Sequence, residues 1–234
     1  MEHSFSFETK VNLQLPKDWG EMNDGMWIYV CRCLAAGFQP QEVAEHFVVR
    51  ALGKMAKLIP EMQIVVAAEC MDFIAKSPKF PCRPEKVDGV RAVDAEFHEV
   101  EFAKYLAAEN YYQAAISEEG NEEAMDGLVS VMYPGYNENY PVEKDTGNRN
   151  AIRYISIMWY TAVKSMFSEI FYHLFKPVKN EEETDMRKVM TMQIHVLSGG
   201  DITKEKDILE ADVWSALTEL DTKIEEAEQI KKIK

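Results

Sequence analysis

The sequence predicts a mainly α-helical protein with a minor β component: a helical bundle-like core, a short N-terminal strand or arm, and a short central strand. Three observations lead to this fold class. Apolar residues recur with helical spacing, between start and stop residues, through most of the chain. Two segments alternate polar and apolar residues with a period of two. A proline-rich segment separates the first helical part from the second.

The N-terminal segment from Phe5 to Leu15 has the alternation of a strand. Its odd positions are apolar except for Thr9, and its even positions are polar. Period-two alternation is typical of a strand with one buried face. The segment is longer than an average strand, so it is bent, split in two, or an extended arm lying on a partner. Pro16 ends it.

The first third of the chain is predicted to be helical after this strand. Asp24 is placed to cap a helix over residues 26–36. Pro40 and Pro60 each stand where a proline fits best, at the beginning of a helix. Gly53 follows the last apolar position of the second helix, where glycine commonly ends a helix.

A connection over residues 77–91 is the best candidate for a domain boundary. It contains Pro78, Pro81 and Pro84 and an Asp88-Gly89 turn, which together favour extended structure and turns. The predicted division is therefore an N-terminal strand with helices over 1–76, the connection over 77–91, and a helical lobe over 92–234. The two outer parts form either one domain or two lobes.

The second part begins with the segment "VDAEFHEV", whose alternation predicts the short central strand. Two helices follow, the second with Asn121 as its cap. Residues 134–150 show no periodicity and are predicted to form a long loop. The apolar segment from Ala151 to Phe175 is long enough to cross a bilayer, but its polar residues fall on one stripe. We therefore expect an amphipathic helix there and no membrane partner.

The double glycine in "SGGDITK" separates the last two helical segments. A phosphate-binding P-loop would need Gly-Lys followed by Ser or Thr, and a dinucleotide loop would need to follow a strand. Neither condition is met. Gly199 and Gly200 are instead predicted to end one helix, and Asp201 or Thr203 to cap the next turn. No catalytic signature occurs elsewhere, so no cofactor is predicted and a non-enzymatic role is favoured.

Composition limits the class of partner and the compartment. The 234 residues include 26 Lys and Arg against 40 Asp and Glu, a formal net charge of −14, which would repel a phosphate backbone. Nucleic acid is therefore not expected as a partner, whereas a protein partner is. The first ten residues lack the pattern of a secretory signal. We expect a cytoplasmic chain whose cysteines Cys31, Cys33, Cys70 and Cys82 are free thiols.

Asp94, Glu96 and His98 form the sharpest local group of chemically active residues. On a strand, alternate residues point to the same side, so two carboxylates and one imidazole could face a metal ion or a small ligand. The same alternation also arises from a half-buried strand with one wet face, and no second metal-binding cluster accompanies it. A metal-dependent enzyme or ligand-binding protein thus remains the alternative, and the wet face is the favoured interpretation.

Aromatic residues provide the candidate contacts with a partner. Tyr133, Tyr136 and Tyr140 lie in or beside the long predicted loop, and Trp159 lies on the amphipathic helix. Large aromatic side chains are common both in cores and as anchors of interfaces. The sequence leaves both roles open for these four residues.

Three blocks of the sequence suggest an origin: "LPKDWGEMNDGMWIYVCRCLAAGF", "RAVDAEFHEVEFAKYLAAENYYQ" and "VLSGGDITKEKDILEADVWSALTELDTK". They resemble uncharacterised phage or prophage proteins of gut bacteria, encoded among tail-morphogenesis genes. The resemblance implies no site residues. It implies a virion-assembly accessory, such as a tail-assembly chaperone, or a minor structural component that is associated with the virion. The partner would be a phage structural protein or a second copy of the chain in a homo-oligomer.

Overall fold

The computed structural model describes residues 11–117, 120–140, 148–176 and 186–233. These residues are mainly helical. The first part contains α1 (Asp24–Ala35), α2 (Pro40–Leu52) and α3 (Glu61–Glu69), with short 3₁₀ helices η1 (Trp19–Glu21), η2 (Gly53–Leu58) and η3 (Asp72–Ala75). The middle contains α4 (Phe102–Ser117), α5 (Glu122–Met132), α6 (Tyr136–Asn139) and α7 (Arg149–Ile170). The last part contains α8 (Met186–Ser198), η5 (Ile202–Lys204), α9 (Glu205–Glu210) and α10 (Val213–Ile233).

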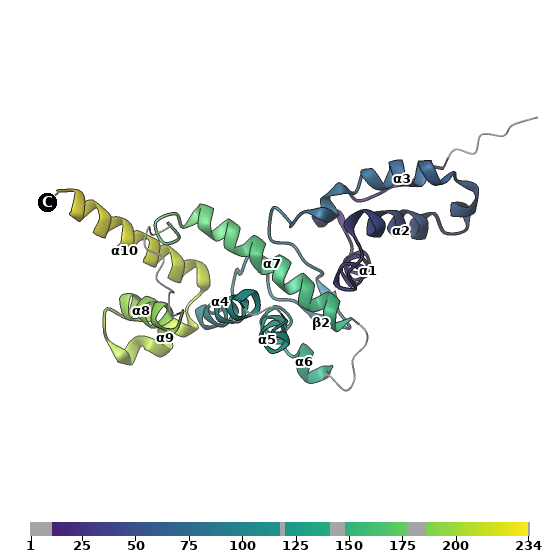
Figure 1. Ribbon diagram of the computed structural model, residues 1–234. Coiled ribbons are helices and arrows are strands. Elements are labelled where there is room, and N and C mark those ends of the chain that lie inside the picture. Colours follow the sequence, from purple (N-terminus) through teal and green to yellow (C-terminus); the bar gives the residue numbers. More distant parts are fainter. Residues whose placement is uncertain (1–10, 118–119, 141–147, 177–185, 234) are drawn as a thin grey trace, which may run out of the picture.

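Long helix α7 runs through the middle of an elongated molecule (Figure 1). Helices α2 and α3 extend from one end, and α8, α9 and α10 lie at the other end. Helices α1, α4 and α5 are seen nearly end-on while α7 lies across the picture, and α1 and α5 both pack against α7. The long helix therefore crosses its neighbours steeply instead of running beside them, and the expected bundle-like core is not confirmed.

The described β structure is one two-stranded antiparallel hairpin. Strand β1 (Lys86–Val87) pairs with β2 (Val90–Arg91) across the predicted Asp88-Gly89 turn. Asp88 and Gly89 both have positive φ angles, 50° and 87°, which suits the tight turn of a two-residue hairpin. An isolated bridge between Glu101 and Asp212 also ties the beginning of α4 to the beginning of α10.

Both strands expected from alternation need correction. Residues 93–98 form turns, so the predicted central strand is wrong. The reason is local, because the Asp94 side chain accepts hydrogen bonds from the backbone N–H groups of Glu96 and His98 and folds the segment on itself. Of the predicted strand from Phe5 to Leu15, residues 11–15 are not in a strand, and residues 5–10 lie outside the described part of the chain.

Most of the predicted helix ends are confirmed. Pro40 begins α2, the Asn121 side chain caps α5, and Gly199 with Gly200 ends α8 at positive φ angles of 63° and 82°. The Asp201 side chain then caps η5, as the sequence predicted. At α1 the cap is Asn23 and not Asp24, since the Asn23 side chain accepts from the backbone N–H of Met26.

Helix α7 contains the buried centre of the molecule. It begins at Arg149 and ends at Ile170, five residues before the expected end at Phe175. Its polar stripe is exposed or half-buried, while the opposite face is buried against α1, α4 and α5. Among the described residues, no helix is both long and apolar enough to cross a membrane. The division at 77–91 stays a prediction, although buried apolar side chains from both sides of it join one continuous cluster.

Helices α4 and α5 approach each other closely at Gly127. A Cβ atom at this position would lie 2.4 Å from the Tyr111 ring, well inside van der Waals contact. We expect Gly127→Ala to lower the free energy of unfolding by about 1–2 kcal/mol, because overpacking outweighs the gain of about 1 kcal/mol in helix propensity. Urea unfolding followed by circular dichroism measures this change.

Gly25→Ala is the matched control, because its Cβ would meet only the Asn23 Oδ1 atom at an ordinary 3.4 Å. This substitution should leave stability unchanged or slightly higher. The Tyr111→Ala background should remove the cost of Gly127→Ala. A Gly127→Ala protein as stable as the wild type would show that these helices are not in close contact.

Candidate functional site

The predicted group Asp94, Glu96 and His98 lies in a turn that the sequence did not predict. Asp94 uses Oδ1 to accept both backbone hydrogen bonds at 3.0 Å, and Glu96 Oε2 lies 3.3 Å from His98 Nε2. The three side chains therefore do not point to one side as strand residues would. Within the described ranges, no group of three His, Cys, Asp or Glu side chains is placed to hold a metal ion. The geometry gives the metal-dependent alternative no support.

Two tryptophans hold this turn in place. Trp159 Nε1 donates to the Ala95 carbonyl and Trp214 Nε1 donates to the Glu96 carbonyl, both at 2.8 Å. The Phe97 ring is fully buried and stacks on Trp159 with ring centroids 5.2 Å apart. Phe97 has a φ of 65°, a left-handed conformation that costs a non-glycine residue about 1–3 kcal/mol. Packing and hydrogen bonds fix the conformation of this turn.

Asp94 and His98 also line a hollow of about 420 Å³ beside the turn. Its charged side chains are three cations and three carboxylates, besides His98: Arg83, Arg91, Lys104, Glu85, Asp94 and Glu99. Burial lowers the pKa of Arg83, whose guanidinium donates to the Val93 carbonyl. The charges balance, so this hollow does not select a ligand of either sign.

The predicted aromatic contacts are used within the molecule. Tyr133, Tyr136 and Trp159 are buried, and Tyr140 is half-buried. The Tyr133 hydroxyl donates to the Pro84 carbonyl at 2.8 Å. The Tyr136 hydroxyl donates to a carboxylate oxygen of Asp88 at 3.1 Å. The Tyr140 hydroxyl donates to the backbone carbonyl of Asp88 at 2.6 Å. The three tyrosines thus hold the β1–β2 hairpin, and a partner would have little of their rings to contact.

Two of the four cysteines, Cys31 and Cys82, have the environment of unreactive thiols. Cys31 is buried, and burial followed by the neighbouring Cys33 raises its pKa. Burial, and next Asp18, raise the pKa of Cys82 to about 12. Because the thiolate is the reactive form, both side chains stay protonated and unreactive near neutral pH.

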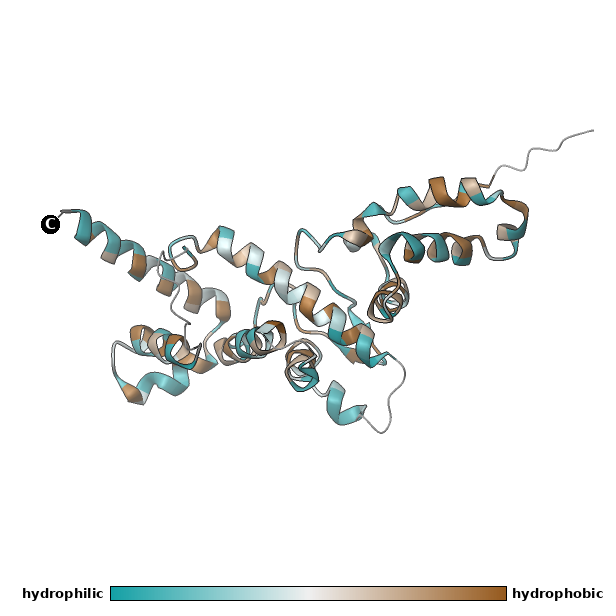
Figure 2. Ribbon diagram, in the orientation of Figure 1, coloured by the Kyte–Doolittle hydropathy of each residue, from teal (hydrophilic) through white to brown (hydrophobic). Residues whose placement is uncertain are grey.

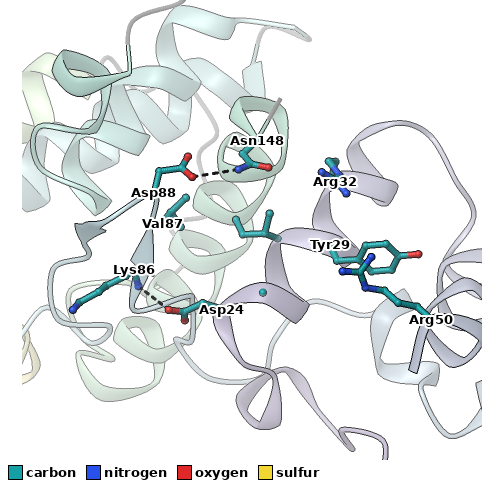
Figure 3. Close-up of a pocket in the computed structure, with 10 residues that line it drawn as sticks. Asp24, Tyr29, Arg32, Arg50, Lys86, Val87, Asp88 and Asn148 are labelled. Atoms are coloured by element: carbon teal, nitrogen blue, oxygen red, sulfur yellow. Dashed lines mark hydrogen bonds between the residues drawn. The ribbon is translucent and has the colours of Figure 1, made fainter. Parts of the chain in front are cut away.

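The charged hollow shown in Figure 3 is a site that the sequence did not predict. It has a volume of about 330 Å³ and lies between α1, α2, the β1–β2 hairpin and the residue before α7. On the hairpin side, Asp24 accepts from the backbone N–H groups of Glu85 and Lys86 at 2.9 and 3.2 Å. The Asn148 amide donates to the Asp88 carboxylate at 3.5 Å. The carboxylates of this side are therefore already bonded.

The opposite side of the charged hollow is cationic. Arg32 of α1 and Arg50 of α2 line it, and the Arg50 guanidinium lies 4.7 Å above the centre of the Tyr29 ring (Figure 3). Within the described part of the chain, the ion pairs include neither Arg32 nor Arg50. Burial of the Tyr29 hydroxyl raises its pKa, and the nearby Cys33 adds to this effect. The hydroxyl under the Arg50 guanidinium therefore stays neutral. This arrangement can accept an anionic group.

Helix α3 presents an uncovered apolar surface, which we call the α3 face: Leu58, Met62 and Val66. These side chains are 67%, 71% and 55% exposed. Met62 and Val66 are one helical turn apart on α3, and Leu58 ends η2 shortly before this helix, so one partner surface could cover all three. The brown ribbon of α3 in Figure 2 marks the same apolar stretch at the end of the molecule. A surface of this kind is typical of protein contacts.

No protein-family model, curated protein or solved structure matches the chain. The functional argument therefore rests on the residues and geometry of this chain.

Proposed function

We propose that the chain is a non-enzymatic protein–protein interaction protein that acts as an accessory or chaperone in phage or prophage tail assembly. The α3 face carries the interaction part of this proposal. The resemblance of the three sequence blocks to proteins encoded among tail-morphogenesis genes supports the assembly part. The protein would act in the cytoplasm of the host cell, with incorporation into the virion as the later step.

The sequence of α3 has the apolar character of a buried helix. Its residues "EMQIVVAAE" include five consecutive apolar residues, Ile64 to Ala68, a pattern typical of a helix buried on several sides. Yet Ala68 is its single buried residue, although α2 packs against α3. An apolar helix at the tip of an elongated molecule gains stability when a partner covers it, at about 1.5–3 kcal/mol for each large side chain.

A chaperone role fits the charge and the position of this face. The net charge of −14 keeps an accessory protein soluble while one of its helices stays apolar and exposed. The α3 face lies far from α8–α10, so a partner could bind it without displacing the central helices (Figure 1). The partner class that follows is a tail protein with an apolar helical segment, such as a tape-measure protein.

Co-purification tests this proposal. The chain, expressed together with a phage tape-measure protein, should form a complex that elutes as one peak in size-exclusion chromatography. Met62→Ser/Val66→Ser should weaken this complex about tenfold or more. In the wild type, binding buries two apolar side chains, and the variant lacks this favourable contribution. Calorimetric titration of the purified proteins measures the change.

Ile202→Ser serves as the control, because Ile202 is 77% exposed and lies at the other end of the molecule. This variant should bind as the wild type does. Absence of a complex with both the tape-measure and the tail-tube proteins would refute the assembly role. A complex that Met62→Ser/Val66→Ser leaves intact would refute the α3 face as its site.

A further inference from the structure

We infer that the charged hollow of Figure 3 and a second hollow beside it bind a short acidic peptide segment of a protein partner. A carboxylate of the peptide lies between Arg32 and Arg50, and an adjacent apolar side chain fills the second hollow. This inference rests on the proposed function because it takes the partner to be a protein, but it concerns a surface other than the α3 face.

The two arginines of the charged hollow have no carboxylate within ion-pair distance among the described residues. The whole protein carries 40 acidic residues against 26 basic ones, and this hollow is lined by Arg32 and Arg50 as well as by Asp24 and Asp88, while the Lys86 ammonium points away from both arginines (Figure 3). Both carboxylates already accept hydrogen bonds, Asp24 from backbone N–H groups and Asp88 from the Tyr136 hydroxyl. An incoming carboxylate therefore meets guanidinium donors with the planar geometry that suits it.

The second hollow adds apolar recognition. It has a volume of about 320 Å³ and is lined by Met26, Phe47 and Ala51. Tyr29 and Arg50 line both hollows, so the Arg50 guanidinium stacked on the Tyr29 ring forms the wall between them. Stacking holds the guanidinium in place before a ligand arrives, which reduces the entropy lost on binding.

The two hollows together select one class of ligand. A glutamate or aspartate next to leucine or phenylalanine carries an anion and an apolar group on neighbouring residues, one for each of the two adjoining hollows. A free phosphate would occupy the charged hollow and leave the apolar one empty. The geometry thus favours an acidic and apolar peptide segment over a free anion.

Fluorescence anisotropy with the full chain tests this inference. The probe is a labelled peptide in which glutamate alternates with leucine; the comparison peptides replace glutamate by glutamine, or leucine by serine. We expect both comparison peptides to bind at least about tenfold more weakly. Arg32→Gln/Arg50→Gln should weaken binding of the first peptide by the same factor. Ala51→Glu should weaken it too, because a carboxylate would enter the apolar hollow.

Lys206→Gln/Lys231→Gln is the matched control, because it removes two exposed charges at the far end of the molecule. It should bind the peptide as the wild type does. Equal binding of the glutamine peptide, or of Arg32→Gln/Arg50→Gln, would overturn the inference. So would complete competition by inorganic phosphate at the peptide's own concentration, which would identify a free-anion site. A tape-measure complex that forms without peptide binding would leave the proposed function standing and reject this inference alone.

Discussion

Replacing Asp126 with alanine is expected to lower the free energy of unfolding by about 3–5 kcal/mol. Asp126 of α5 accepts hydrogen bonds from Arg153 Nε and Nη2 at 2.7 and 2.8 Å, and from Arg149 Nη1 at 3.1 Å. Both arginines belong to α7 and are buried, with 7% and 6% exposure. Without Asp126, two buried guanidinium groups would lose their shared anion, and the contact between α5 and α7 would weaken.

Urea unfolding measures this loss, and Asp72→Ala is its control. Asp72 forms an ion pair with Lys76, but both side chains are exposed, at 69% and 67%. Removing it should leave the free energy of unfolding nearly unchanged, because water screens an exposed pair. A similar, small loss in both variants would contradict the structural role of the Asp126 network.

The Asp126 network also predicts how stability depends on pH. Burial alone would raise the pKa of Asp126, but the hydrogen bonds and charge of Arg153, and then of Arg149, outweigh burial and lower it below the usual 3.8. The stabilisation is therefore fully present above the pKa of the unfolded chain and is lost as pH falls through the lower folded pKa. The stability difference between wild type and Asp126→Asn should be constant above about pH 5 and shrink below about pH 4.

The sequence predicted the helix ends and the turn that are determined by the residues at those positions. Pro40, Asn121 and the pair Gly199–Gly200 each act on the backbone of their own helix end, so their roles were readable without tertiary structure. The Asp88-Gly89 turn was readable for the same reason, since both residues accept positive φ angles. The mainly helical class with a minor β part follows from these local signals.

The segment from Val93 to His98 shows where periodicity misleads. Alternation of polar and apolar residues indicates which side chains are exposed and which are buried. It does not determine the backbone conformation that buries the apolar ones. Phe97 is buried, as a strand would bury it, but at a left-handed φ in a turn. The compensating contacts come from Trp159 and Trp214, which are distant in sequence. A strand prediction could not include them, and it therefore placed Asp94, Glu96 and His98 on one side.

The charged hollow of Figure 3 could not be predicted for a related reason. Its lining comes from four separated segments, around residues 24–32, at Arg50, at the 86–88 turn and at Asn148. Its two arginines, Arg32 and Arg50, are too far apart in sequence to form a motif. A weak signal existed: α1 and α2 each carry an arginine in the last turn, where a cation complements the helix dipole. Only the packing of α1 beside α2 brings them to one hollow.

Trp159→Ala is expected to destabilise the protein by about 3–5 kcal/mol, because a large side chain at the centre of the core is lost. The Trp159 ring is fully buried, stacks on Phe97, and meets Tyr160 edge-on at 6.0 Å. Trp159→Phe separates packing from hydrogen bonding. It keeps an aromatic ring but leaves the Ala95 carbonyl without its donor, and should cost about 1–3 kcal/mol.

Thermal and urea unfolding of both variants, followed by circular dichroism, measure these losses. The order of stability should be wild type, Trp159→Phe, Trp159→Ala. If Trp159→Ala cost less than about 1 kcal/mol and instead abolished binding to a partner, Trp159 would be an interface anchor, the second role that its sequence context left open. Because the Ala95 and Phe97 contacts of Trp159 also hold the turn beside α10, we expect the larger loss to spread to the α10 end of the molecule.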